Sequence, residues 1–74
     1  MAYRQDVKNS AARIWTKTQF KETITQCKAN GFTVNKLDTV MIQVVDPRTD
    51  TLVLSGSIMN NRWLVRIDQT YFAK

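Results

Sequence analysis

Few residues in this sequence could carry out acid–base, nucleophilic or metal chemistry. The chain has no histidine, so it lacks the side chain that most often acts as a general base or a metal ligand near neutral pH. Cys27 is the single thiol, and its helical spacing with Phe20 and Ile24 predicts a small buried hydrophobic residue rather than a nucleophile. The sequence indicates no catalytic residue, and we expect a protein that is not an enzyme.

The carboxylates and glycines also favour structural roles. Four aspartates lie near the predicted ends and turns of strands, where aspartate stabilises turns: Asp38, Asp46, Asp50 and Asp68. Their spacing matches no calcium-binding loop, and one cysteine cannot form a zinc cluster. Gly31 and Gly56 are the only glycines and form no phosphate-binding motif. We therefore expect neither a metal site nor a cofactor.

The positive charge of the chain points to anionic partners. Eleven Lys and Arg residues against six Asp and Glu give a formal charge of +5, which favours nucleic acid or acidic proteins. Two sets of basic residues, one on a predicted helix and one on a predicted strand, could each follow a phosphate backbone: Lys17, Lys21 and Lys28, and Arg62 and Arg66. A modest excess of charge also keeps a small protein soluble, and lysines beside an apolar stripe often cover the edge of a core.

The length and composition predict one folded domain. With 74 residues, of which 43% are hydrophobic and 23% charged, the chain has room for one core. We expect a single α+β domain over residues 11–74, preceded by a flexible or irregular arm over residues 1–10. Domains of this size are marginally stable, which favours pairing with a second copy or a partner. With no apolar run long enough for a secretion signal or a membrane span, we expect a cytoplasmic protein without a membrane partner.

A helix is predicted over residues 17–30. The Thr-x-x-Gln spacing of a capping box begins it at Thr16, and Asn30-Gly31 supplies residues that commonly end helices. Its apolar stripe follows the helical period: Phe20, Ile24 and Cys27. Extending the helix backwards would place the preceding apolar residues outside this stripe. A short strand over residues 12–15 is therefore favoured, and a continuous helix from about residue 10 is the alternative.

The remainder of the chain predicts strands. After the helix the hydrophobic period changes to two and β-branched residues become frequent. Strands are expected over residues 32–37, 39–45, 51–59 and 62–69. An Asp- and Pro-containing turn and the pair Asn60-Asn61 would join them as hairpins. The predicted fold is α+β, with one helix packed on a three- or four-stranded antiparallel β-meander and a short N-terminal strand as an additional element.

Alternation along these strands predicts two unlike faces of the sheet. The first face is uniformly apolar and is expected to pack on the helix: Val40, Ile42, Val44, Leu52, Leu54, Ile58, Trp63, Val65 and Ile67. The second face mixes apolar and polar side chains: Met41, Gln43, Val45, Val53, Ser55, Ser57, Met59, Arg62, Leu64, Arg66 and Asp68. A sheet face in contact with water is usually more polar than this, and one helix cannot cover both faces.

The second face is therefore predicted to contact another protein or a second copy of the chain. The predicted contact residues are adaptable methionines, aliphatic residues and arginines: Met41, Val53, Met59, Leu64, Arg62 and Arg66. We expect a small basic accessory protein, an adaptor, inhibitor or self-associating subunit of the kind found in phages and mobile elements. The alternative is a sequence-tolerant nucleic-acid-binding domain that uses the lysines and arginines named above. A further alternative is that the N-terminal arm and Tyr71-Phe72 fold across this face.

Overall fold

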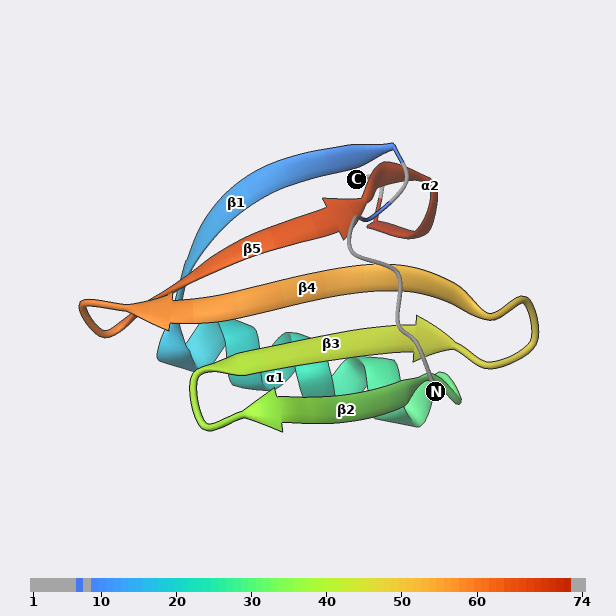
Figure 1. Cartoon of the computed structure of the whole chain (residues 1–74), viewed down its shortest axis with the longest axis horizontal. Helices are drawn as coiled ribbons and strands as arrows, with labels where there is room; N and C mark the ends of the chain where they lie inside the picture. Colours follow the sequence, from blue (N-terminus) through green and yellow to red (C-terminus); the bar gives the residue numbers. More distant parts are fainter. Residues whose placement is uncertain (1–6, 8, 73–74) are drawn as a thin grey trace.

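The chain forms one antiparallel sheet with a helix across one of its faces (Figure 1). The computed structural model describes residues 7 and 9–72, so the predicted arm over residues 1–10 lies largely outside the described residues. In chain order the elements are β1 (Ser10–Thr16), α1 (Lys17–Ala29), β2 (Thr33–Asp38), β3 (Met41–Asp46), β4 (Thr51–Met59), β5 (Arg62–Asp68) and α2 (Gln69–Phe72). The described strands lie in the order β1-β5-β4-β3-β2. The predicted α+β class is confirmed, but the sheet has five strands rather than three or four.

The fifth strand, β1, is a full member of the sheet. It pairs with β5 without interruption from Ser10 opposite Asp68 to Thr16 opposite Arg62. Local sequence predicted only residues 12–15 as strand, because two alanines and an arginine give weak alternation. The full length of β1 depends on its long-range pairing with β5, which local sequence does not show. That pairing arises because α1 carries the chain from the β1 edge to the opposite edge, where β2 starts a meander that returns to β1 (Figure 1).

Helix α1 begins and ends close to the predicted positions. The hydroxyl of Thr16 accepts a hydrogen bond from the Gln19 backbone N–H at 3.1 Å, and the Gln19 side chain accepts one from the Thr16 N–H at 3.0 Å. This reciprocal pair is the predicted capping box. The helix ends at Ala29, and Gly31 follows with a φ of +87°, which glycine adopts without steric cost. The alternative of a continuous helix from about residue 10 is wrong.

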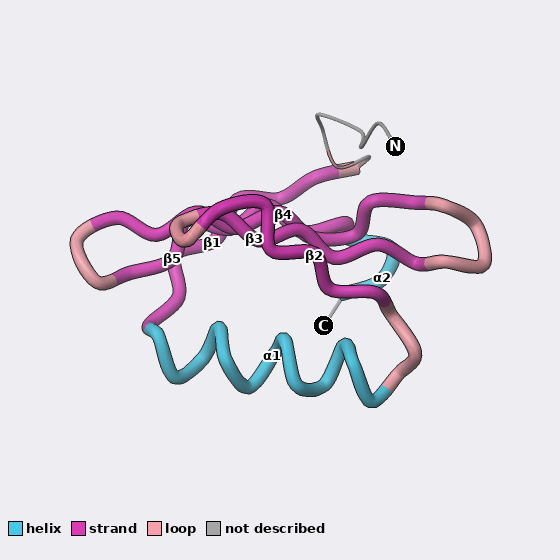
Figure 2. Tube along the Cα trace, turned by 60° about the horizontal axis from the view of Figure 1, so that its bottom comes forward, coloured by secondary structure: helices cyan, strands magenta, loops and turns pink. Residues whose placement is uncertain are grey.

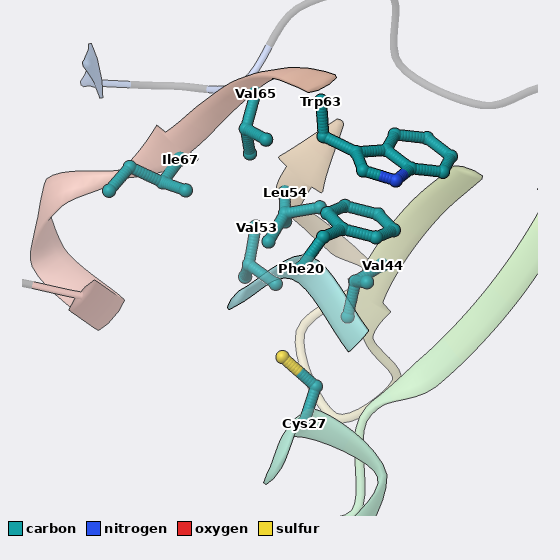
Figure 3. Close-up of a cluster of buried hydrophobic side chains, with 8 residues drawn as sticks. All are labelled: Phe20, Cys27, Val44, Val53, Leu54, Trp63, Val65 and Ile67. Carbon is teal, nitrogen blue, oxygen red and sulfur yellow. The ribbon is translucent and has the colours of Figure 1, made fainter. Parts of the chain in front are cut away.

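The core lies between α1 and the sheet face that α1 covers (Figure 3). The rings of Phe20 and Trp63 stack at 3.9 Å between centroids with an interplanar angle of 8°. A Cβ atom on Gly56 would lie 2.8 Å from Cε1 of Phe20, so glycine is what lets this ring lie against β4. Cys27 is buried beside these residues, as predicted. Val40, predicted in the core, is instead 43% exposed in the turn between β2 and β3.

An irregularity between β3 and β4 changes which residues of β4 face the helix. Val44 pairs with Leu54 and Val45 pairs with Leu52, which leaves Val53 as an extra residue at this step. Val53 is 0% exposed and belongs to the core, whereas Leu52 shares the opposite face with Val45. The predicted faces of Leu52 and Val53 were therefore wrong. Strict alternation was assumed, and it reverses at the bulge.

The last residues of β5 lead into α2 rather than into a longer strand. The ring of Tyr71 meets that of Phe32 edge-on, with centroids 5.8 Å apart, and both pack against the core beneath the sheet. The Tyr71 hydroxyl also donates a hydrogen bond to Oδ2 of Asp46 at 3.1 Å. Tyr71 and Phe72 therefore lie on the helix side, and the alternative in which they cover the second face is wrong.

The tight turns agree with their sequences. Asn60 and Asn61 have φ values of 53° and 65°, as a two-residue hairpin turn requires. In the preceding turn, Oδ1 of Asp46 accepts a hydrogen bond from the Arg48 N–H at 3.0 Å, and Asp50 adopts a φ of 54°. Both predicted turns are confirmed. They fix the register of β3 on β4 and of β4 on β5.

Candidate protein-contact face

The sheet face that points away from α1 carries a group of exposed side chains at its β1 end. Figure 2 shows α1 on one side of the sheet, and the described chain places no helix on the other side. Strand register arranges these side chains in two rows that run across β1, β5 and β4. We call them the open patch, which consists of Ile14, Leu64 and Ser57 in one row and Ala12, Arg66 and Ser55 in the other.

The open patch is hollowed. Its six residues line a cavity of about 440 Å³ that is open to solvent. The hollow arises because small side chains alternate with large ones: Ala12 adjoins Arg66, and Ser57 adjoins Leu64. A protruding side chain of a partner could enter this space beside Ile14 and Leu64, above the small side chains. The hydroxyls of the serines and the guanidinium of Arg66 supply polar groups at its border.

The apolar residues in and around the open patch are unusually exposed. Ile14 is 65% exposed and Leu64 37%. Met59 and Met41, next to the patch on the same face, are 56% and 38% exposed. Contiguous exposed apolar surface of this kind marks interaction sites more often than scattered single residues do.

The charged groups on this face are positive. Arg62 and Arg66 flank Leu64 on β5, are exposed, and form no ion pair with any described residue. Asp68 is the carboxylate nearest to them along β5, but it is 4% exposed and accepts a hydrogen bond from the Thr70 N–H at 2.8 Å. Neither β1 nor β4 contains an acidic residue. The open patch therefore presents positive charge without internal neutralisation.

The structure brings most of the predicted contact residues together. Met41, Met59, Leu64, Arg62 and Arg66 all lie on the open face. Val53 does not, because the bulge turns it into the core.

The predicted nucleic-acid residues are divided between two sides of the molecule. The three lysines of α1 are exposed on the helix, which covers one side of the sheet, and the two arginines of β5 are exposed on the other side: Lys17, Lys21 and Lys28, and Arg62 and Arg66. A ligand lying flat on either side meets only one of the two sets. The predicted basic residues therefore do not form one surface.

Sequence reasoning missed two features of this face. Ile14 was placed on a short strand but on no face, and the alternation of Ala12 and Ile14 against Trp15 was the available signal. Gln43 was assigned to the face, but its burial was not foreseen. It is 6% exposed, and its Oε1 atom has no hydrogen-bond partner among the described residues. An unsatisfied buried acceptor next to Ser55 is unusual in a folded domain.

Whether the chain before β1 covers this face bears directly on its role. Part of this face is covered, because Leu52, which lies on it, is 2% exposed. Val7, which belongs to the arm, is 5% exposed. Met41 and Leu64, at 38% and 37% exposed, lie outside the covered part. The remainder of the arm lies outside the described residues. The open patch is thus a smaller surface than the whole second face that the sequence predicted.

A second hollow on the described surface contains the single thiol of the chain. It has a volume of about 590 Å³, lies between α1 and α2, and includes Cys27, Phe32 and Tyr71 in its lining. Burial raises the pKa of the Cys27 thiol to about 11, so the reactive thiolate is scarce near neutral pH. Among the described residues, no group of three or more potential ligands is close enough to hold a metal ion.

Comparisons with known proteins find no family model, no curated protein and no solved structure that matches this chain. No described helix has both the length and the apolar character needed to cross a membrane. Function is therefore inferred from the residues of the open patch and its surroundings.

Proposed function

We propose that this protein is a small, basic, non-catalytic binding module that docks its open patch onto another protein. The single observation that carries the proposal is the hollow that Ile14, Leu64 and Arg66 help to line, on a face where Arg62 and Arg66 form no ion pair with any described residue. A fitting partner presents an apolar side chain to the hollow and carboxylates to Arg62 and Arg66. Such a chain acts as an adaptor, an inhibitor or an accessory subunit.

The size of the patch fits a modest interface in which the arginines are needed. Burying one aliphatic side chain of this kind contributes about 1.5–3 kcal/mol. Ile14, Met59 and Leu64 are already partly buried, at 65%, 56% and 37% exposed, so together they offset only the lowest part of the association cost, which is about 4–15 kcal/mol. Hydrogen bonds from Arg62 and Arg66 to carboxylates supply additional affinity and specificity. Loss of either the apolar or the charged contribution should thus weaken the complex strongly.

The alternative function, binding of nucleic acid, has weaker support. In its favour, Arg62 and Arg66 are exposed and could contact phosphates. Against it, the described open face has no exposed aromatic ring for base stacking, since Trp63 is 8% exposed and points toward the core. The lysines of α1 lie on the other side of the sheet. These observations favour a protein partner.

The proposal is tested by affinity capture with the tagged chain from its native host, with and without nuclease. Leu64→Asp should abolish capture, because it removes an apolar side chain from the hollow and places a carboxylate between Arg62 and Arg66, where it competes with the carboxylates of the partner. Thr25→Asp is the matched control, since it makes the same change of charge at an exposed position of α1. Thermal unfolding of both variants verifies that they remain folded.

The expected result is a partner that is retained by Thr25→Asp, lost with Leu64→Asp and insensitive to nuclease. Equal capture by both variants would refute docking through the open patch. Capture that nuclease removes, and that Lys17→Glu with Lys21→Glu also removes, would favour nucleic acid instead. Direct titration with mixed DNA and RNA at low salt completes this test, because phosphate contacts weaken steeply as salt is raised.

A further inference from the structure

The two edges of the sheet differ in their protection against pairing with another strand. At the β2 edge the register shifts between Lys36 and Asp38, and an edge lysine together with such an irregularity discourages further pairing. The β1 edge has no register shift, and its one charged residue is Arg13. Its seven residues pair with β5 without a shift, contain no proline or lysine, and include the highly exposed Ile14. β1 is thus the edge that remains available.

The outward-pointing backbone groups of β1 can be identified from its hydrogen bonds. The Asn9 carbonyl accepts a hydrogen bond from the Gln69 N–H at 3.1 Å. The backbone N–H and C=O groups of the odd-numbered residues of β1 therefore point toward β5. The Thr16 N–H is instead used by the Gln19 side chain, outside the ladder. The even-numbered residues therefore direct their N–H and C=O groups away from the sheet, and those available for pairing belong to Ser10, Ala12 and Ile14.

The side chain of Arg13 occupies part of this edge. Its Nη1 atom donates a hydrogen bond to the Ala12 carbonyl at 2.8 Å. Arg13 is exposed, and no described carboxylate forms an ion pair with it. A carboxylate on an incoming strand would attract the guanidinium and release the Ala12 carbonyl for backbone pairing. A basic side chain at the same place would not.

We propose that β1 accepts an extended acidic segment of a partner protein, which adds to the sheet as a sixth strand. Backbone hydrogen bonds to Ser10, Ala12 and Ile14 hold the segment, and its side chains alternate in character. The side chain opposite Ile14 lies on the open face and is apolar, whereas the side chain opposite Arg13 is acidic. The added strand continues the open patch beyond Ile14. This inference rests on the proposed function in assuming a protein partner, but it uses the edge rather than the hollow.

The probe is a labelled peptide that alternates valine with glutamate, and fluorescence anisotropy measures its binding to the whole chain. The control peptide alternates valine with lysine. We expect the glutamate peptide to bind and the lysine peptide to bind at least about tenfold more weakly. Arg13→Glu should reverse this preference. Equal binding of the two peptides, or a preference that Arg13→Glu leaves unchanged, would overturn the proposal.

Backbone pairing is tested by Ala12→Pro, which removes one outward N–H. Proline is tolerated on edge strands when its missing N–H faces solvent, so the fold should persist. We expect an affinity loss of about tenfold, and a clearly smaller loss for Ala12→Ser, which keeps the N–H. Unchanged binding by a folded Ala12→Pro variant would exclude strand addition at β1. If that variant does not fold, the peptide preference of Arg13→Glu tests the proposal by itself.

Two further outcomes separate this inference from the proposed function. If the parent chain does not bind the glutamate peptide but Leu64→Asp still abolishes capture of a partner, the edge proposal fails and the open patch stands. If the peptide binds and Leu64→Asp leaves capture intact, the edge stands and the open patch fails. Sedimentation velocity over a range of concentrations tests the competing occupant, because a dimer that Ala12→Pro dissociates would assign the edge to a second copy.

Discussion

The two faces of the sheet are built from the same strands but differ in what their side chains do. Along β5, Trp63, Val65 and Ile67 are buried against the core, while the residues between them are exposed. Alternate residues of this one strand therefore pack in the core and contact solvent. The comparison indicates that substitutions on the covered face should change stability, and that those on the open face should change recognition.

The largest expected effect is on the covered face. Phe20→Ala removes a ring that is 3% exposed and stacked on Trp63, so we expect a loss of about 3–5 kcal/mol in the free energy of unfolding. Small domains have little stability to spare, so the variant should unfold at a much lower urea concentration than the parent. Urea denaturation followed by circular dichroism measures the change. A loss below about 1 kcal/mol would mean that this stack does not anchor the core.

Gly56→Ala should have the next largest effect. The added Cβ would lie 2.8 Å from Cε1 of Phe20 and 3.3 Å from Cε3 of Trp63, so the stacked rings must shift. We expect a cost of about 1–3 kcal/mol in the free energy of unfolding. The same substitution in a Phe20→Leu background should cost less, because the smaller side chain relieves the clash. Equal costs in both backgrounds would show that the ring is not the obstacle.

Asp46, which accepts a hydrogen bond from Tyr71 of α2, should make the stability of the fold depend on pH. Burial would raise the pKa of its carboxyl group, but hydrogen bonds from Arg48 and Tyr71 and the positive charge of Arg48 lower it below its usual value. A lowered pKa in the folded chain contributes stability above the unfolded pKa of about 3.9, and this is lost as the pH falls through the folded value.

Asp46→Asn should therefore make stability less dependent on pH in the acidic range. Between about pH 7 and about pH 3, the melting temperature of the parent chain should decrease more than that of the variant. Arg48→Ala is the companion change, because it removes a hydrogen-bonding partner and the positive charge while leaving the carboxyl group in place. Identical acid profiles for all three proteins would contradict the assigned role of Asp46.

The smallest expected effect on stability is on the open face. Ile14→Thr keeps a β-branched side chain on β1 and changes a residue that is 65% exposed, so the free energy of unfolding should change by no more than about 0.5 kcal/mol. The same change should weaken capture of the protein partner. A large loss of stability would show that Ile14 is covered in solution, and the contrast between the two faces would no longer hold.

Local sequence patterns were sufficient for the parts of the fold that depend on near neighbours. The capping box at Thr16 and the paired asparagines at the last hairpin act within a few residues, so both were predicted correctly. The pairing of β1 with β5 joins residues far apart in the chain and leaves little local trace. The bulge at Val53 depends on the register of β3 and β4, which a single sequence does not specify.

The candidate site was predicted unevenly for the same reason. Leu64 and Arg66 follow from alternation along β5, where no irregularity intervenes. Val53 was lost because the bulge reverses alternation in β4, and Ile14 was missed because its face is defined only by its pairing with Leu64. The hollow itself depends on small and large side chains that meet across three strands, which no single segment reveals.

The buried thiol of Cys27, on the covered side of α1, can report how often the chain opens. Cys27 is the only cysteine, is 2% exposed, and holds its proton near neutral pH because burial raises its pKa to about 11. Because the Cys27 side chain is almost inaccessible, fast alkylation of its sulfur atom requires the helix to move away from the sheet or the chain to unfold. The rate of alkylation therefore measures how often the chain opens. Comparing this rate with the rate of global unfolding would reveal whether the helix detaches alone or together with the strands.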